Sequence, residues 1–319
     1  MCGIVGYVGK QNTVEFLLNG LKELEYRGYD SAGIAVLNDD SIDVYKALGK
    51  LKNLEEKTTT ALNKEFNLGI GHTRWATHGK PTELNAHPHL GEYSYVVHNG
   101  IIENYKELKD DLTKKGHKFV SQTDTEVIVH LFENLNNQLN NTTQAFKQTI
   151  EKLEGAFSIL LISKADPSKI FFFKHGSPLI IAKGKEEGEA LFSSSDAPLI
   201  GLAGDVVYLE DGVGGVVTNG EIEFFSDDYT WSSLPESKQY AQKDGFRFFM
   251  EKEIHEQADV VVDTMLGRIK DENIDFDEID SSIIEGINEI KICACGTSYH
   301  AGLTASYLFE RLSKTKCNV

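Results

Sequence analysis

The feature that most constrains the fold is a succession of short strand-like runs in the second half of the chain. Between residues 156 and 225, seven such runs follow one another with only short turns between them. They lie at 157–162, 170–174, 179–182, 190–193, 206–209, 215–218 and 221–225. Further strand patterns occur at 4–8, 34–37, 42–48 and 93–97, and helical patterns occur at 14–24, 102–112 and from 123 to 135. Strands joined by short turns, with helices grouped between them, favour an α+β fold of antiparallel sheets covered by helices.

The composition of the sequence changes after residue 225, where the succession of strand-like runs ends. Residues 226–245 are polar and read as an exposed connector. A helical stretch at 249–269 and an acidic loop at 271–282 follow, and then a strand at 290–295, a small-residue turn and a helix at 300–312. Strand, tight turn and helix are typical of the start of a parallel α/β unit. Because 319 residues suggest about two domains, we expect a first domain at 1–240, a linker at 241–250 and the start of a second domain at 251–319.

Composition and charge limit the partners. The chain has 32 Lys and Arg against 49 Asp and Glu, a net charge of −17, which argues against nucleic acid or an anionic membrane as the main partner. No apolar run is long enough to span a bilayer, and we see no signal peptide. Four cysteines in such a long chain make a disulfide framework unlikely and favour a reducing compartment. We therefore expect a cytoplasmic protein.

Cys2 carries the clearest chemical signal. If Met1 is removed, this residue presents a thiol and a free α-amine together. The amine has a reference pKa of roughly 7.7–8.0, so it can accept the thiol proton, as in N-terminal nucleophiles. A thiol that attacks an amide carbonyl forms a thioester and releases ammonia. The alternative is a small apolar residue at the head of a buried strand.

The segment 72–79 is a second candidate. Arg74 offers a planar fork that suits a carboxylate, and hydroxyl, imidazole and backbone donors lie within a few residues of it. We interpret the segment as a loop that could bind the α-carboxylate of an amino acid. The alternative is a structural loop with a surface Arg74 and a packed Trp75.

Two shorter patterns could complete such a site. The Asn99 amide and the Gly100 N–H could both donate to a developing oxyanion, although Asn-Gly is also a common turn. Thr123-Asp124-Thr125-Glu126 has the form of a helix cap, and its functional interpretation is a carboxylate for a substrate ammonium.

The remaining candidates are a cluster of histidines, two cysteines and a turn of small residues. Five of the ten histidines lie between residues 72 and 98, but none has an acidic or cysteine partner at a recognised ligand spacing, so we predict no metal. Cys293 and Cys295 are interpreted as buried sulfur in a strand rather than as zinc ligands. Gly296, Thr297 and Ser298, between strand and helix, could cradle a sugar phosphate.

Taken together, these segments resemble the glutamine–fructose-6-phosphate aminotransferase (glucosamine-6-phosphate synthase) family. The matching stretches are 1–6, 25–33, 72–79, 85–89, 96–104, 123–126, 251–257 and 295–298. Related glutaminase domains, such as amidophosphoribosyltransferase, share the N-terminal cysteine and the Arg-Gly-x-Asp-Ser-Ala-Gly stretch. Trp75-Ala76-Thr77-His78 and Cys295-Gly296-Thr297-Ser298 point instead to the hexosamine enzymes.

The resemblance implies a four-layer αββα N-terminal-nucleophile hydrolase sandwich, followed by the start of an α/β sugar-isomerase (SIS) domain. It implies that Cys2 is the nucleophile with its α-amine as base, and that Asn99 and Gly100 form the oxyanion hole. Glutamine is then held by Arg74, Thr77, His78 and Asp124, and Trp75 sits on a loop that gates ammonia. Fructose 6-phosphate is held by a site that begins at Gly296, Thr297 and Ser298. No cofactor is implied, and the full-length enzyme is expected to be a homodimer.

This sequence departs from the family in two ways. Ala258 stands where the family usually has proline, and the remainder of the isomerase half is absent, so we expect this chain at most to hydrolyse glutamine. The alternatives are another glutamine amidotransferase, a stand-alone glutaminase, or a non-catalytic phosphosugar-binding module.

Overall fold

The protein is described here from a computed structural model. The structure describes residues 2–38, 41–75, 79–234, 246, 248–265, 269–270, 273–274 and 286–319. The chain divides into two compact units, Met1–Gln242 and Lys243–Val319, and each is considered by itself. In the described part of the chain, no helix is both long and apolar enough to cross a membrane.

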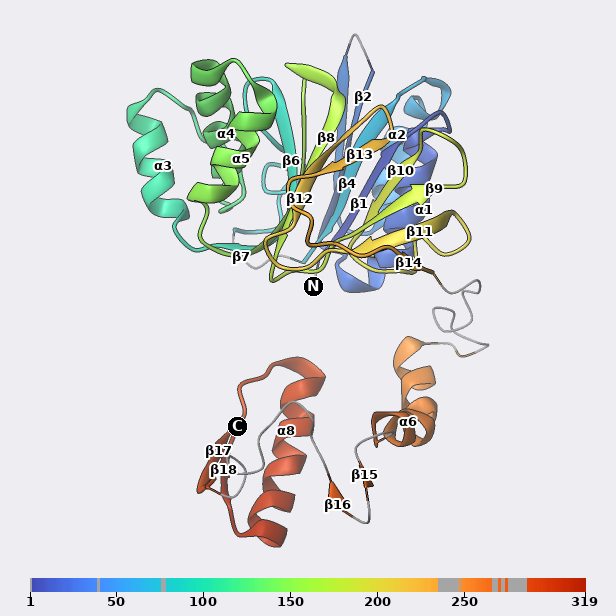
Figure 1. The fold of residues 1–319 in the computed structure, drawn as a ribbon, viewed down its shortest axis with the longest axis vertical. Helices are drawn as coiled ribbons and strands as arrows, with labels where there is room; N and C mark the ends of the chain where they lie inside the picture. The colour runs from blue at the N-terminus through green and yellow to red at the C-terminus, as the bar shows by residue number, and fades with distance from the viewer. Residues whose placement is uncertain are drawn as a thin grey trace. The chain divides into compact units, whose positions relative to one another are not determined.

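Two antiparallel sheets form the centre of the first unit (Figure 1). The eight-stranded sheet has the order β14-β11-β9-β10-β1-β4-β2-β3, and the six-stranded sheet has the order β13-β12-β8-β7-β6-β5. The strands are β1 Gly3–Val8, β2 Ser31–Leu37, β3 Ile42–Leu48, β4 Leu68–Arg74, β5 His89–Leu90, β6 Ser94–Ile102, β7 Gly155–Ser163, β8 Asp166–His175, β9 Ile180–Gly184, β10 Ala190–Ser193, β11 Ala203–Tyr208, β12 Gly214–Thr218, β13 Glu221–Phe224 and β14 Ser232–Ser233. β1 and β4 therefore lie in the middle of the larger sheet.

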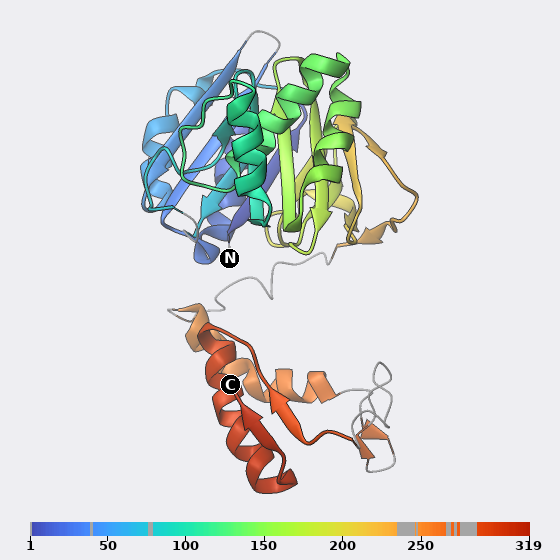
Figure 2. The same cartoon turned by 90° about the vertical axis from the view of Figure 1, so that its left-hand side faces the viewer.

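Helices cover the outer face of each sheet, and the two sheets face each other (Figures 1 and 2). The helices of the first unit are α1 Thr13–Leu24, α2 Leu51–Thr58, α3 Tyr105–Lys114, α4 Glu126–Leu139 and α5 Thr142–Lys152. One apolar core lies between α1, α2 and the larger sheet, a second between the two sheets, and a third between the smaller sheet and α3–α5. The order helix, sheet, sheet, helix confirms the predicted αββα architecture.

The strand pattern predicted from the sequence is confirmed, including the hairpin in which β2 pairs with β3. Asn99-Gly100 is a correction, because β6 runs through both residues to Ile102 and pairs along its whole length with β7. The segment 72–79 is also not wholly a loop, since its first three residues belong to β4. α2 and α5 were not predicted at all.

The second unit holds the helix α6 Phe249–Met265, the short pair β15 Ile269–Lys270 and β16 Asn273–Ile274, and the strand β17 Glu289–Lys291. α8 Gly296–Leu308 follows and leads to β18 Lys316–Asn318, which pairs parallel to β17. The strand expected at 290–295 therefore ends early, and Cys293 and Cys295 are exposed rather than buried. Much of the predicted connector and of the acidic loop lies outside the described residues.

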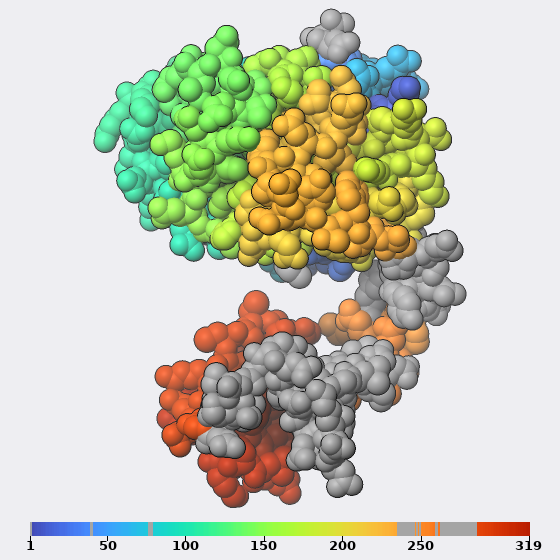
Figure 3. All heavy atoms as spheres, viewed as in Figure 1, coloured from blue at the N-terminus to red at the C-terminus, as the bar shows by residue number. Residues whose placement is uncertain are grey.

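Side chains of the smaller sheet's edge reach the surface of the first unit. Figure 3 shows β13 and the segment that leads to β14 spread across one face of this unit. There Phe224 stacks on Tyr229, with ring centroids 3.8 Å apart. This edge of the smaller sheet is thus covered by aromatic side chains.

Candidate active site

Cys2 lies at the beginning of β1, in the middle of the larger sheet. Gly3, which follows it, pairs with Thr73 of β4, and this register brings Cys2 beside the end of that strand. The Trp75 backbone N–H donates to the Cys2 Sγ at 3.2 Å, and the thiol points toward the Trp75 carbonyl oxygen at 3.6 Å. Cys2 is half-buried. The thiol is thus oriented by the backbone of the residue that follows the adjacent strand, and it still borders solvent.

Burial raises the pKa of the Cys2 thiol above its ordinary value. The Trp75 N–H and the nearby charges of Arg74 and Arg27 oppose that rise without cancelling it. The resting group near neutral pH is therefore the thiol and not the thiolate. A nucleophilic Cys2 needs a base that removes this proton.

Asn99 and Gly100 reach Cys2 from the other sheet. The Asn99 side-chain Nδ2 donates to the Cys2 carbonyl oxygen at 3.2 Å, so β6 and β1 meet at this point. Gly100 has a φ of +122°, and a Cβ there would lie 2.0 Å from the Ala156 carbonyl oxygen. Only glycine fits this position, where the β6 backbone comes close to β7. Of the two donors predicted for an oxyanion, the Asn99 amide thus contacts Cys2, and Gly100 follows it on the same strand.

Arg74 is buried, which contradicts the alternative of a surface arginine. Its guanidinium donates to the carbonyl oxygens of Gly79 at 3.1 Å and Lys80 at 3.4 Å. It thereby ties the end of β4 to the chain that returns after residues 76–78. Thr77 and His78 lie outside the described residues.

Trp75 is not packed in the core, because 45% of its surface is exposed. Its ring meets Tyr29 edge-on, with centroids 5.4 Å apart. The alternative of a packed tryptophan is therefore wrong. The ring lies at the surface against Tyr29, while the Trp75 backbone contacts the Cys2 thiol.

Asp124 is buried, and its Oδ2 accepts the Ile102 backbone N–H at 2.8 Å. Thr125 precedes α4 but makes no capping bond with its side chain. Glu126 instead accepts the backbone N–H groups of Val120 at 2.8 Å and Ser121 at 2.7 Å. The capping interpretation of 123–126 is thus wrong, since these carboxylates anchor neighbouring backbone.

Four of the clustered histidines are buried together, which sequence spacing alone did not indicate. His72, His87, His89 and His98 lie between the two sheets or beside them. His87 stacks on His72 with ring centroids 4.0 Å apart, and burial holds the pKa of His72 at about 3. Among the residues that the structure describes, no group of three or more His, Cys, Asp or Glu is placed to hold a metal ion.

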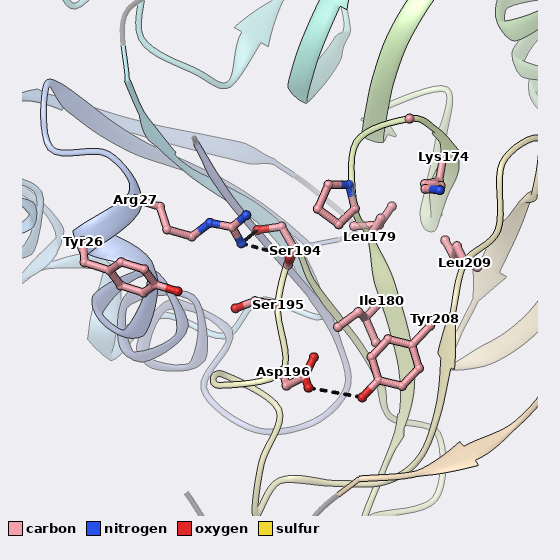
Figure 4. Close-up of a pocket in the computed structure, with 12 residues that line it drawn as sticks. Tyr26, Arg27, Lys174, Leu179, Ile180, Ser194, Ser195, Asp196, Tyr208 and Leu209 are labelled. Carbon is pink, nitrogen blue, oxygen red and sulfur yellow. Dashed lines mark hydrogen bonds between the residues drawn. The ribbon is translucent and has the colours of Figure 1, made fainter. Parts of the chain in front are cut away.

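Sequence reasoning also missed Arg27 and Ser194. The Arg27 Nη1 donates to the Ser194 carbonyl oxygen at 3.0 Å, and the Ser194 hydroxyl accepts the Ile4 N–H at 3.1 Å. These bonds fix β1 two residues beyond Cys2. They border a cavity of about 440 Å³ in which the Tyr208 hydroxyl donates to Asp196 at 3.3 Å (Figure 4). The only signal for Arg27 was the 25–33 stretch.

Gly296, Thr297 and Ser298 form the first turn of α8 in the second unit. All three are exposed, and Gly296 has a φ of +62°. The backbone N–H groups at the start of a helix are free to meet an anion. The turn predicted at 296–298 is therefore part of the helix, which begins at Gly296 and not near residue 300, and the phosphate site stays a prediction.

Comparisons with known proteins agree with this geometry. Residues 72–200 match the family model described as a glutamine amidotransferase domain. The glutamine–fructose-6-phosphate aminotransferase (isomerizing) of Campylobacter jejuni is 53% identical over all of this chain and 54% of its own length. The enzyme of the same name from Helicobacter pylori is 46% identical over 99% of this chain and 52% of its own length. The chain spans about half the length of the curated relatives it matches.

Among solved structures, the glutamine phosphoribosylpyrophosphate amidotransferase of Bacillus subtilis is similar in fold. The TM-score is 0.61 at 23% identity, over 71% of this chain and 50% of the other. The fold and the matched domain define the class: the chain contains a glutamine amidotransferase domain of the N-terminal-nucleophile hydrolase fold. Its sequence identity is more specific. Over its whole length the chain is similar to enzymes named glutamine–fructose-6-phosphate aminotransferase (isomerizing), the family that its motifs resemble.

Proposed function

We propose that this chain hydrolyses glutamine at Cys2 and supplies the ammonia for the synthesis of glucosamine 6-phosphate from fructose 6-phosphate. The observation that carries the proposal is the convergence of two sheets on one residue. Trp75 N–H reaches the Cys2 sulfur at 3.2 Å, and the Asn99 amide reaches the Cys2 carbonyl oxygen at 3.2 Å. A thiol and a pair of amide donors are thus held within one small region.

The chemistry needs three groups of this chain. After Met1 is removed, the α-amine of Cys2 takes the thiol proton, and the sulfur attacks the glutamine side-chain carbonyl carbon. The negative charge that develops on the carbonyl oxygen is stabilised by the Asn99 side-chain amide and the Gly100 N–H. The C–N bond then breaks, and the α-ammonium returns its proton to the leaving nitrogen, which departs as ammonia. Water attacks the resulting thioester, the sulfur leaves, and glutamate is released with a free Cys2.

The residues around the thiol suit a free amino acid. Arg74 carries a buried guanidinium that can pair with the α-carboxylate, and the Asp124 carboxylate can accept from the α-ammonium. We assign Thr77 and His78 to the same role on sequence grounds alone. Trp75, exposed beside the thiol, is assigned to the loop that controls where ammonia goes.

The second unit extends the proposal to the complete enzyme. We assign 251–319 to the start of a sugar-isomerase domain, after a linker at 241–250. The parallel pair β17 and β18 with α8 between them supports this assignment. Gly296, Thr297 and Ser298 are assigned to the phosphate of fructose 6-phosphate. We further propose a cytoplasmic enzyme that needs no cofactor and is a homodimer at full length.

The test is ammonia release from glutamine by the 319-residue chain. We expect Cys2→Ala to abolish release, and we expect Cys293→Ala to retain it because that thiol is exposed in the other unit. Release by Cys2→Ala at the parental rate would contradict the mechanism. Chain that retains Met1 is expected to be inactive, since the α-amine is then displaced from Cys2.

A stand-alone glutaminase or another amidotransferase would also release ammonia. Calorimetry with fructose 6-phosphate, carried out on the full-length protein, separates these functions. Binding of the sugar phosphate would favour the hexosamine enzyme. Sugar-phosphate binding without any ammonia release would favour a non-catalytic phosphosugar module.

A further inference from the structure

His72 contacts the proposed oxyanion donor and has no role in the chemistry described so far. It lies on β4, where it pairs with Ile4 of β1 and Gly33 of β2. Its side chain crosses to the other sheet. There its Nε2 lies 3.0 Å from the Asn99 Oδ1 and 3.1 Å from the His98 carbonyl oxygen. The ring is fully buried.

The His98 carbonyl determines which ring nitrogen of His72 carries the proton. A backbone carbonyl only accepts hydrogen bonds, so the His72 nitrogen that faces it must be Nε2–H. The ring is neutral, because burial lowers its pKa to about 3. The other nitrogen, Nδ1, has no hydrogen-bond partner in the described part of the chain. His72 is therefore a fixed donor toward Asn99.

This donor in turn determines the orientation of the Asn99 amide. An Asn side chain can place either its oxygen or its NH₂ group on a given side. Because His72 Nε2–H donates, the Asn99 oxygen must face it. The NH₂ group then points to the opposite side, where its Nδ2 lies 3.2 Å from the Cys2 carbonyl oxygen. A flipped amide would turn an acceptor toward the reacting carbonyl and repel the oxyanion.

Neighbouring residues restrain the His72 ring. His87 stacks on it with ring centroids 4.0 Å apart and an interplanar angle of 29°. The Thr125 hydroxyl lies 3.0 Å from the His87 Nε2. A Cβ on Gly33 would lie 2.3 Å from the His87 carbonyl oxygen, so glycine there allows the His87 segment to approach. The ring is packed in place and does not depend on its single contact with Asn99.

We propose that His72 is a positioning residue that holds the Asn99 carboxamide with its NH₂ group turned toward the oxyanion at Cys2. The inference rests on the proposed glutaminase function and adds the group that sets the orientation of its oxyanion hole. His72 touches no reacting atom. Its loss is expected to weaken stabilisation of the transition state while leaving the binding of glutamine unchanged.

Two substitutions separate the donor from the volume of the ring. His72→Phe keeps a flat ring and removes the donor, whereas His72→Gln places a side-chain NH₂ near the former Nε2. Removal of an oxyanion-hole donor lowers kcat by about 10²–10³-fold. We expect the loss of its orientation in His72→Phe to lower kcat by roughly 10- to 100-fold with KM unchanged. His72→Gln is expected to restore most of this loss.

Three further measurements distinguish orientation from general damage. A glutamine analogue with an aldehyde in place of the side-chain amide reacts with the Cys2 thiol to give a tetrahedral adduct. The affinity of His72→Phe for this analogue should therefore fall by the same factor as kcat. No oxyanion forms when glutamate binds or when iodoacetamide alkylates Cys2. The affinity for glutamate and the rate of alkylation should therefore not change. His130→Phe, which removes another buried histidine in contact with Glu126 and His117, serves as the matched control and should keep the parental kcat.

Parental kcat in His72→Phe would overturn the inference, as would equal defects in His72→Phe and His72→Gln. A parallel fall in glutamate affinity and thiol alkylation would also overturn it, because that pattern indicates structural damage. A parent chain that releases no ammonia would instead contradict the proposed function. The aldehyde affinities of the variants would then still decide the role of His72.

Discussion

The buried neutral histidine predicts how the first unit responds to acid. His72 is fully buried, and its pKa falls from 6.5 to about 3 because the charged form is desolvated. The unfolded chain takes up this proton as the pH falls below about 6.5, whereas the folded chain stays neutral until about pH 3. Between these values the unfolded state binds more protons, so the free energy of unfolding rises with pH and falls with acid.

The magnitude follows from the same two values. At pH 5 the unfolded state is favoured by RT ln(1 + 10^1.5) for this one group, which is about 2 kcal/mol. At pH 7 the same expression gives only about 0.2 kcal/mol. The pKa values of His87 and His89 are also lowered by burial, so they change the stability in the same direction. A loss of this size is a large part of the stability of a typical domain.

The assay is urea unfolding at pH 7 and pH 5, followed by tryptophan fluorescence. Both tryptophans, Trp75 and Trp231, lie in the first unit, so the signal reports on that unit. We expect His72→Phe to lose about 2 kcal/mol less than the parent between the two pH values, whatever its absolute stability. His175→Gln is the control, since that side chain is exposed, and should lose as much as the parent. Equal losses in His72→Phe and the parent would refute the argument from burial.

Two further predictions concern the proposed catalytic groups. Gly100→Ala is expected to lower kcat and to destabilise the fold by at least about 1–3 kcal/mol, from the strain of a positive φ alone. The clash of the new Cβ with the Ala156 carbonyl oxygen at 2.0 Å adds to this cost. An unchanged urea midpoint would contradict the prediction. The pH profile of kcat/KM should rise through about 7.7–8.0 as the Cys2 α-amine loses its proton, because only the neutral amine accepts the proton of a thiol whose pKa is raised by burial. A flat profile from pH 6 to 9 would show that the amine is not the base.

Short apolar runs and the turn residues between them were sufficient to predict the strands that follow one another along the chain. Those between residues 156 and 225 are joined by short turns, and half of the consecutive pairs, β7–β8, β9–β10 and β12–β13, are neighbours in one sheet. β4 was missed because its sequence alternates glycine with Leu68 and Ile70, and glycine disfavours strands. Its place between β1 and β2 comes from pairing with strands far away in sequence.

Asn99-Gly100 shows the opposite error. The dipeptide has a strong turn preference, yet pairing of β6 with β7 carries the strand through it, and glycine accepts a φ of +122° there. The chemical interpretation of Asn99 does not depend on a turn, because it rests on the donor type alone, and it stays a prediction. The partners of Asn99 were beyond reach, since His72 approaches it from the other sheet.

Burial likewise could not be inferred from sequence for the charged and aromatic residues of the site. Arg74 is buried and Trp75 exposed, the reverse of what their side chains favour in isolation. This difference in burial follows from the positions of the two residues. Arg74 ends the central strand β4, and Trp75 is the first residue beyond it. Motifs therefore nominated the site residues, whereas the burial of their side chains required the fold.

The measurement that tests the central claim most directly is the competition of hydroxylamine with water for the γ-glutamyl group that glutamine transfers to the enzyme. If Cys2 forms a γ-glutamyl thioester, hydroxylamine competes with water for it, and γ-glutamyl hydroxamate appears at the expense of glutamate. We predict hydroxamate formation by the chain lacking Met1 and none by Cys2→Ala. Ammonia release that continues with no hydroxamate at any hydroxylamine concentration would contradict a covalent intermediate at Cys2.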